Sequence, residues 1–83
     1  MAENIPYGKI TSPEQLGRWL RHKRKQLGVD QVRAAGLAGV GVRFLSELER
    51  GKPTLELGKV LRVVERLGLE LHLVARGGPG VER

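Results

Sequence analysis

Two short stretches of helical spacing stand close together in the middle of the chain, with a glycine-rich turn between them. The first covers residues 31–37 and follows Asp30, a residue type that caps helix N-termini. The second covers residues 42–50 and ends at the Gly-Lys-Pro of 51–53, where glycine favours helix termination and proline prevents continuation. Two short helices joined by a three- or four-residue turn that contains glycine form a helix-turn-helix, and the turn at 38–41 predicts this motif.

Longer amphipathic stretches flank this motif on both sides. In the Ser-Pro-Glu-Gln of 12–15, serine caps, proline suits the first helical position, and the glutamine completes a capping box, so a helix should run from here to Leu27. After the motif, Thr54 is expected to cap a fourth helix over residues 55–67, whose leucines and valines recur along one face. Four helices are therefore predicted over residues 12–68.

The charge balance favours an anionic partner. Lysine and arginine total 15 against 9 aspartates and glutamates, which gives +6 over 83 residues. Aromatic residues are only 4% of the chain, so it lacks the stacking surface that proteins use for single-stranded nucleic acid. The shortage of aromatic residues weakens an interpretation as an RNA-binding protein.

Several function classes are disfavoured by what the sequence lacks. Without cysteine, a disulfide framework, a thiolate metal site and a cysteine nucleophile are excluded. His22 and His72 lie 50 positions apart without the carboxylate spacing of a catalytic triad or a metal site, so we expect no enzyme, no metal and no cofactor. No stretch approaches the roughly 20 apolar residues of a membrane span, so we expect a cytoplasmic protein.

After the fourth helix the pattern changes from a period of 3.6 to a period of 2. Leu69, Leu71 and Leu73 alternate with polar or charged residues, which predicts a strand over 69–76. A lone apolar strand is unstable in water and needs a partner. Pairing with its copy in a second subunit would give a two-fold homodimer, and the alternative is pairing with the N-terminal arm near Ile10 in the same chain.

The chain thus divides into four parts by pattern. Residues 1–11 form an irregular N-terminal arm, 12–68 the helix-turn-helix domain, 69–76 a dimerisation strand, and 77–83 a flexible tail.

Residues 31–51 resemble, without a gap, the Cro/repressor-type helix-turn-helix of the XRE-type regulators. The matching positions are the opening glutamine, Gly39 eight positions on, the valine after it, and Leu-Ser-Glu-Leu-Glu-Arg-Gly at 45–51. The resemblance extends over roughly residues 12–68. It implies a mainly α fold with a four-helix repressor-type helix-turn-helix domain. Where the usual regulator of this type has a fifth helix, the pattern here predicts instead one C-terminal β-strand, paired across a homodimer.

The resemblance also implies roles for particular side chains. The positions that face base edges in double-stranded DNA are Gly41, Val42, Arg43, Ser46 and Glu47. The positions that contact phosphates are Gln31, Arg33, Arg50 and Lys52. Arg43 would donate to guanine O6 and N7, and Glu47 would accept from cytosine N4. A buried ion pair is implied between Arg24 and Glu49, with a structural role, and Phe44 is expected to pack under the preceding helix.

The Ser-Pro-x-Gln-Leu start and the strand after the fourth helix narrow the resemblance to the HipB-type antitoxins. These are small dimeric DNA-binding proteins that also bind a kinase-like toxin. The resemblance implies a sequence-specific repressor at a palindromic operator, the antitoxin of a type II toxin-antitoxin pair that represses its own operon. Two alternatives stay open: a stand-alone phage-type repressor without a toxin, and a protein-binding module that uses the fold as a scaffold.

Overall fold

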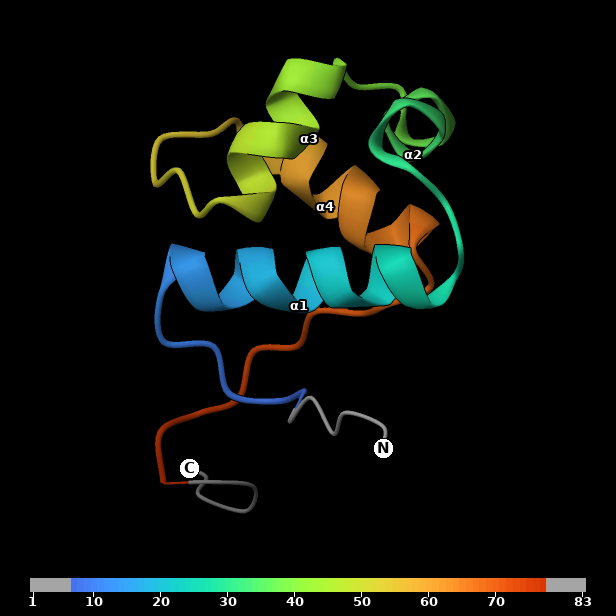
Figure 1. Ribbon diagram of the computed structural model, residues 1–83. Coiled ribbons are helices and arrows are strands. Elements are labelled where there is room, and N and C mark those ends of the chain that lie inside the picture. The colour runs from blue at the N-terminus through green and yellow to red at the C-terminus, as the bar shows by residue number, and fades with distance from the viewer. Residues whose placement is uncertain (1–6, 78–83) are drawn as a thin grey trace.

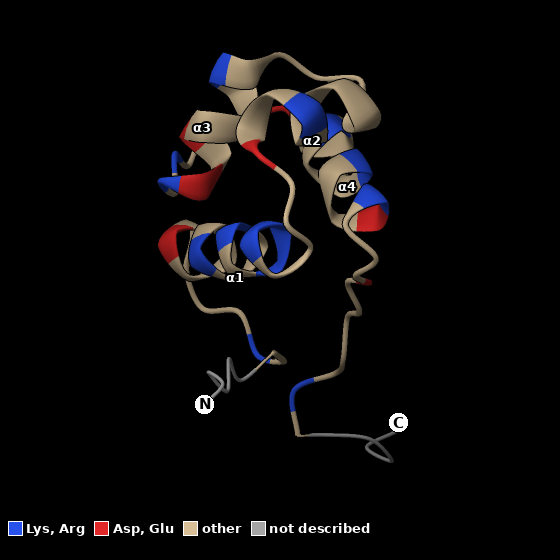
Figure 2. Cartoon of the chain, turned by 45° about the vertical axis from the view of Figure 1, so that its right-hand side comes forward, with Lys and Arg blue, Asp and Glu red and all other residues tan. Residues whose placement is uncertain are grey.

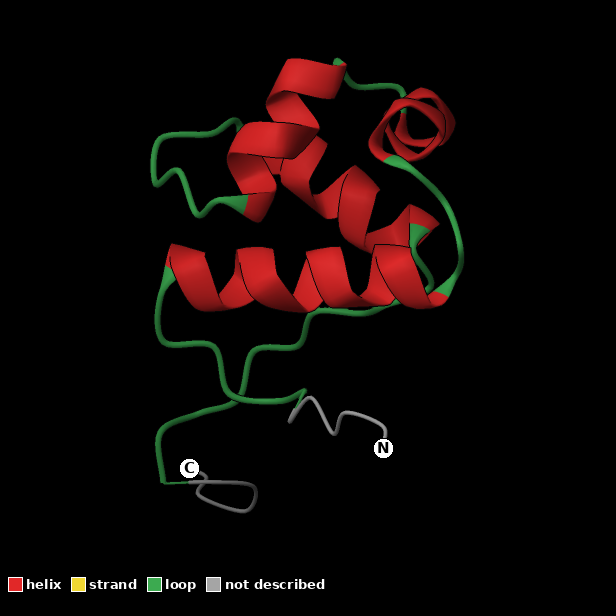
Figure 3. Ribbon diagram, viewed as in Figure 1, coloured by secondary structure: helices red, strands yellow, loops and turns green. Residues whose placement is uncertain are grey.

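The computed structural model describes residues 7–77, and its helices stack into a small body from which both chain ends emerge on one side (Figure 1). The four helices are α1 (Pro13–Gln26), α2 (Gln31–Ala38), α3 (Val42–Glu49) and α4 (Leu57–Arg66). Within the described residues every regular element is a helix, and the connections are loops and turns (Figure 3). The predicted mainly α architecture with four helices is therefore confirmed.

Helix α1 begins as its capping pattern predicts. Ser12 has an extended backbone, and its Oγ accepts a hydrogen bond from the Gln15 N–H at 3.1 Å. The Gln15 side chain reaches back to the N–H of Thr11 at 2.7 Å, one residue earlier than in a standard capping box. The helix ends one residue before the predicted Leu27, which is its C-cap, and Gly28 turns the chain with φ of 74°.

The two helices of the central motif differ in how they are capped. Asp30 Oδ1 accepts a hydrogen bond from the Arg33 N–H at 2.9 Å and so satisfies one of the first N–H groups of α2. Gly39 ends α2 in the left-handed conformation with φ of 69°. Gly41 caps α3 without a side-chain hydrogen bond. The predicted bounds of both helices differ from the observed ones by a single residue.

The start of α4 corrects the sequence prediction. The helix was expected from residue 55 with Thr54 as its cap, but it begins at Leu57 with Glu56 as N-cap, and no side chain caps it. The physical reason is Leu55, which packs against the core from the preceding loop. The first helical hydrogen bonds accordingly go to the Glu56 carbonyl, from Lys59 at 3.1 Å and Val60 at 3.2 Å.

The predicted strand over 69–76 is not formed in this single chain. Residues 69–75 run as an irregular segment away from the helices, and no ladder joins them to the arm near Ile10 within residues 7–77 (Figures 1 and 2). Leu69 is half-buried against the core, whereas Leu73 is fully exposed. The intrachain alternative is therefore wrong for the described residues, because the two segments exchange no backbone hydrogen bonds. Pairing between subunits stays a prediction.

The core draws side chains from all four helices. Leu20 of α1, Leu45 of α3 and Val63 of α4 are the largest fully buried side chains, and three alanines of α2 complete the cluster. Helices α1 and α3 approach closely at Gly17, where a Cβ would lie 2.5 Å from the carbonyl oxygen of Leu48. This close packing fixes α3 against the long first helix.

Candidate nucleic-acid interface

The first half of α3 lies on the side of the molecule opposite the two chain ends (Figure 1). Burial of Leu45 and Leu48 in the core turns the other face of this short helix outward. Of the predicted base-contacting positions, Gly41 and Val42 are exposed. The side chain of Arg43 is 90% exposed. The start of α3 therefore presents an accessible surface that carries the guanidinium group of Arg43.

Glu47 lies at the centre of a small charge network on this face. Its carboxylate pairs with Arg43 Nε at 3.3 Å and with Lys52 Nζ at 3.4 Å, and only 17% of its side chain is exposed. Partial desolvation acts to raise the pKa of Glu47, but hydrogen bonds from Arg43 and Lys52, together with their charges, outweigh it and lower this pKa below its ordinary value. Glu47 is thus ionised at neutral pH and holds two cations of the predicted contact set.

A second pair of predicted contact residues is joined in the same helix. Arg50 Nη1 donates to Ser46 Oγ at 2.6 Å, across one turn of α3. Arg50 is exposed and Ser46 half-buried. The structure therefore brings the predicted phosphate contact Arg50 beside the predicted base contact Ser46.

The side chain of Gln31 lies against the interior. Its Nε2 donates to Glu49 Oε1 at 3.0 Å, and the residue is half-buried at the start of α2. Arg33, two residues further along α2, is exposed. Of the predicted phosphate contacts, Arg33, Arg50 and Lys52 thus lie on the surface, whereas the amide of Gln31 is engaged with a buried carboxylate.

Arg24 and Glu49, which the family resemblance pairs, form a buried forked ion pair. Arg24 Nε lies 2.7 Å from Glu49 Oε2, and Nη2 lies 3.0 Å from Oε1. The third guanidinium nitrogen donates to the Val29 carbonyl at 2.9 Å. Hydrogen bonding to Glu49 raises the pKa of Arg24, desolvation opposes it, and the charges of Glu49 and Asp30 add to the increase. The pair fastens α1, the loop to α2 and the end of α3 together.

Two cations of α4 contact the central motif, and the sequence did not predict either contact. Arg62 Nε donates to the Ala38 carbonyl and Nη2 to the Gly39 carbonyl, both at 3.2 Å. Lys59 Nζ lies 5.7 Å from the centre of the Phe44 ring, which is half-buried against the core. The helical period alone offered no signal for these contacts.

Basic side chains are spread over α1, α2 and α4 (Figure 2). On α1 the exposed ones are Arg18, Arg21 and Lys25. The positive charge is therefore distributed over several helices rather than concentrated on α3, whose own charges are mixed. The excess charge can therefore attract a polyanion without specifying its sequence.

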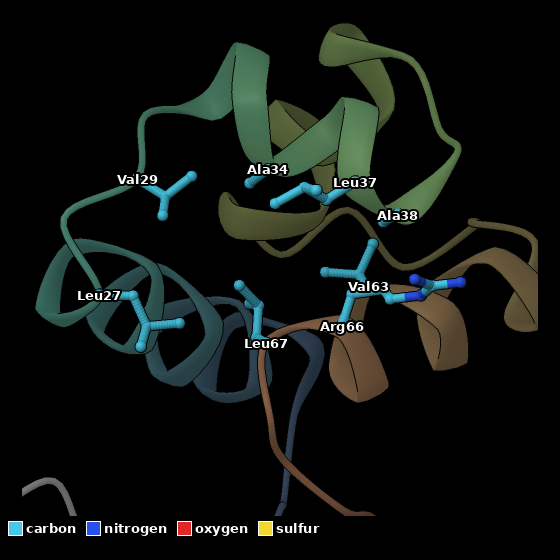
Figure 4. Close-up of a pocket in the computed structure, with 8 residues that line it drawn as sticks. All are labelled: Leu27, Val29, Ala34, Leu37, Ala38, Val63, Arg66 and Leu67. Atoms are coloured by element: carbon cyan, nitrogen blue, oxygen red, sulfur yellow. The ribbon is translucent and has the colours of Figure 1, made fainter.

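The described part of the structure contains a small cavity and an open groove. A cavity of about 40 Å³ lies among α1, α2 and α4 and is lined mainly by apolar side chains such as Leu27, Leu37 and Leu67 (Figure 4). Its volume is close to that of one water molecule. An open apolar groove of about 370 Å³ lies between the start of α1 and the loop before α4. In the part of the chain that the structure describes, no cluster of three metal-ligating side chains occurs, and no helix is long and apolar enough to cross a membrane.

Comparison with known proteins adds to this geometry. A family model described as a helix-turn-helix domain matches residues 15–77. An uncharacterised HTH-type transcriptional regulator, y4mF of Sinorhizobium fredii (strain NBRC 101917 / NGR234), is 44% identical over 69 residues, which cover 83% of this chain and 91% of the relative.

Solved structures with the same fold include regulators and their complexes. The structure of the HipA-HipB-O2-O3 complex contains a chain that matches with a TM-score of 0.76 and 26% identity, over 84% of this chain and 99% of that one. The clp gene regulator ClgR from C. glutamicum matches with a TM-score of 0.66 and 31% identity, over 78% of this chain and 83% of that one. The described helices therefore have the arrangement found in these regulators.

Proposed function

This chain belongs to the XRE-type helix-turn-helix family of DNA-binding transcriptional regulators, and we propose that it is a sequence-specific repressor that acts as an antitoxin. The observation that carries the proposal is the exposed first half of α3, with Arg43 at its outer edge and the helix fixed from within by the Arg24–Glu49 ion pair. A rigid helix with an exposed polar face suits the major groove, where all four base pairs differ in their hydrogen-bonding groups.

In this proposal the base-contacting positions are those predicted from the family, and Arg43 is the principal contact. Its guanidinium is the most exposed charged group of α3 and would exchange its bond with Glu47 for guanine O6 and N7. The further base contacts are Gly41, Val42, Ser46 and Glu47. The phosphate contacts are Gln31, Arg33, Arg50 and Lys52. Because the amide of Gln31 donates to Glu49, Gln31 would act there through the positive N-terminus of α2.

The repressor is proposed to act as a homodimer. Two features support this: Leu71 is 40% exposed and Leu73 fully exposed in the single chain, and their alternation suits a strand. Pairing two such strands would satisfy their backbone groups and relate two copies of α3 by a two-fold axis. A palindromic operator has the same symmetry.

The antitoxin role is supported by the likeness to HipB. That protein occurs with HipA in the solved complex, and its match here extends over nearly its full chain. We propose that this chain likewise binds a kinase-like toxin and represses the operon that encodes both. The corresponding test is copurification with the product of an adjacent reading frame of that type. Failure of a tagged chain to retain that product would leave a repressor without a toxin.

The repressor function is tested by selecting duplexes from a random-sequence library and footprinting the protein on the duplex that it binds most tightly. We expect two half-sites whose centres lie about 34 Å apart, one helical turn. If the protein makes about 6–10 phosphate contacts, its affinity should fall by roughly 10³ to 10⁵ between 50 and 200 mM salt. Equal, weak binding to every duplex would instead support a protein-binding module on the same scaffold.

A further inference from the structure

The turn between α2 and α3 is held by an arginine of the last helix. Arg62 donates from Nε to the Ala38 carbonyl and from Nη2 to the Gly39 carbonyl, at 3.2 Å in each case. These carbonyls belong to the last residue of α2 and to its C-cap, where a helix leaves acceptors without partners of its own. One planar guanidinium therefore satisfies two acceptors at the point where the chain leaves α2.

The backbone of the turn itself only partly fixes the direction of the chain. It contains Gly39 and Gly41 on either side of Val40, and glycine has the widest range of backbone conformations. Gly41 opens α3 without a side-chain cap. The N–H groups of Gly39 and Val40 bond back to the carbonyls of Gly36 at 3.2 Å and Ala35 at 3.0 Å, and the half-buried Val40 side chain packs against the core. The path from α2 into α3 consequently depends on contacts from outside the turn.

A neighbouring cation on α4 contacts the helix that follows the turn. Lys59 lies three positions before Arg62, so both point from the same face of the helix. Its ammonium is 5.7 Å from the centre of the Phe44 ring of α3, within the range of a cation–π contact. Helix α4 thus contacts α2 through Arg62 and α3 through Lys59.

We propose that Arg62 is a positioning residue for base recognition, which sets the angle at which α3 presents Arg43. The inference rests on the proposed function, because it concerns how that function gains its sequence specificity. Base contacts need their donors placed to within about half an ångström, whereas attraction to phosphates depends mainly on charge. Substitution of a residue that orients α3 should therefore reduce the affinity for the selected sequence more than the affinity for random DNA.

The test compares three variants that separate charge from geometry. Arg62→Gln removes the charge and the forked donor, and Arg62→Lys keeps the charge but not the fork. Arg66→Gln is the matched control, because it removes one charge from the same helix at an exposed residue that forms no ion pair within residues 7–77. Each variant is titrated, by fluorescence anisotropy at several salt concentrations, with a duplex selected by the wild-type protein and with a scrambled duplex of the same composition.

We expect both Arg62 variants to bind the selected duplex about fivefold to tenfold more weakly than Arg66→Gln does, as for loss of a specifically oriented pair of hydrogen bonds. For the scrambled duplex, the affinity of Arg62→Lys should match that of wild type, and the affinity of Arg62→Gln should match that of Arg66→Gln, because each pair carries the same charge. The salt dependence of Arg62→Lys should equal that of wild type. The inference would be overturned if Arg62→Lys bound both duplexes with wild-type affinity and Arg62→Gln bound both with the affinity of Arg66→Gln. Arg62 would then be a phosphate contact.

A second measurement does not involve DNA. Amide hydrogen exchange of Gly39 and Val40, whose N–H groups are hydrogen-bonded to the carbonyls of Gly36 and Ala35, should be about fivefold faster in Arg62→Gln than in Arg66→Gln, while the buried amides of α1 stay unchanged. Equal exchange of the turn in both variants would refute the positioning role. If the wild-type protein selects no duplex at all, the repressor proposal fails, and the exchange rates still decide whether Arg62 holds the turn.

Discussion

At the scale of single residues, the molecule separates charges that hold the fold from charges that face solvent. Arg24 and Glu49 are 7% and 6% exposed, whereas the Arg43 side chain is 90% exposed, although each belongs to an arginine–glutamate pair. A buried pair loses more when one partner is removed, because the other charge is left without compensation. The two pairs should therefore respond differently to the same kind of substitution.

Removal of Glu49 tests the buried pair. Glu49→Gln leaves the Arg24 guanidinium buried beside a neutral amide, and the free energy of unfolding should fall by about 3–5 kcal/mol. Urea denaturation of the full chain measures this loss. The control is Arg24→Met combined with Glu49→Leu, which removes both charges and should recover much of the stability. A double variant as unstable as Glu49→Gln would show that packing, not the unpaired charge, causes the loss.

Acid pH tests the exposed network around Glu47. The pKa of Glu47 is lower in the folded chain than in the unfolded chain, so its contribution to stability is present above the unfolded pKa and is lost as pH falls through the folded one. The unfolded value is about 4.3, which places the loss below that pH. Wild type should therefore be more stable than Glu47→Gln at pH 7, and the difference should shrink at pH 3. A difference that is the same at both pH values in urea denaturation would contradict the lowered pKa.

Base recognition at Arg43 is a further residue-scale prediction. Arg43→Ala should cost about 1–3 kcal/mol of binding free energy at one base pair of the selected duplex and relax the preference there. Competition among duplexes that differ at single positions measures this. Arg18→Ala is the control, because it removes an exposed charge from α1, outside the predicted contact set. An equal loss on all duplexes would identify Arg43 as a phosphate contact.

At the scale of elements, the helices were predictable to within one or two residues because their ends carry local signals. Ser12 and Asp30 accept the hydrogen bonds that their residue types predict. The start of α4 was not predictable in this way, since Leu55 stays outside the helix to pack against the core, and tertiary packing overrides the capping pattern. The Arg62 and Lys59 contacts were missed for a related reason: they join segments more than a dozen residues apart, and a helical wheel describes only one segment.

The close approach of α1 and α3 depends on a glycine that the sequence pattern treated as an ordinary helical position. A Cβ at Gly17 would lie 2.5 Å and 2.6 Å from the carbonyl oxygens of Leu48 and Glu49, so the two helices must separate to admit it. Gly17→Ala should lower the free energy of unfolding by about 1–3 kcal/mol, as for other overpacked cores. Urea denaturation of the variant measures the change.

Gly36 offers the opposite case in α2. No atom lies within 4 Å of a Cβ built there, and its φ is not in the left-handed region. Gly36→Ala should therefore raise the free energy of unfolding by about 0.5–1 kcal/mol, because alanine loses less backbone entropy in a helix. Changes of opposite sign in the free energy of unfolding of the two variants would establish packing as the cause. A lower free energy of unfolding in both variants would point to a general intolerance of added volume.

At the scale of the whole molecule, a single copy leaves the C-terminal segment incomplete. Most of its apolar side chains are uncovered, although Leu69 at its start packs against the core. A two-stranded ribbon alone is marginally stable, so it needs an apolar face packed on the helices of both copies. Leu71 and Leu73 share one face of the proposed strand, and Val74 lies on the other.

The dimer proposal predicts a different response from these two faces. Leu71→Asp combined with Leu73→Asp should bury two charges in the proposed ribbon and convert the protein to a monomer, as measured by light scattering over a range of concentrations. Val74→Asp, which adds charge to the opposite face, should keep the mass of the wild type. Because dimerisation stabilises the folded state by mass action, the melting temperature of the wild type should rise with concentration, and that of the double variant should not. A double variant that remains dimeric would place the subunit interface on the helices instead of the strand.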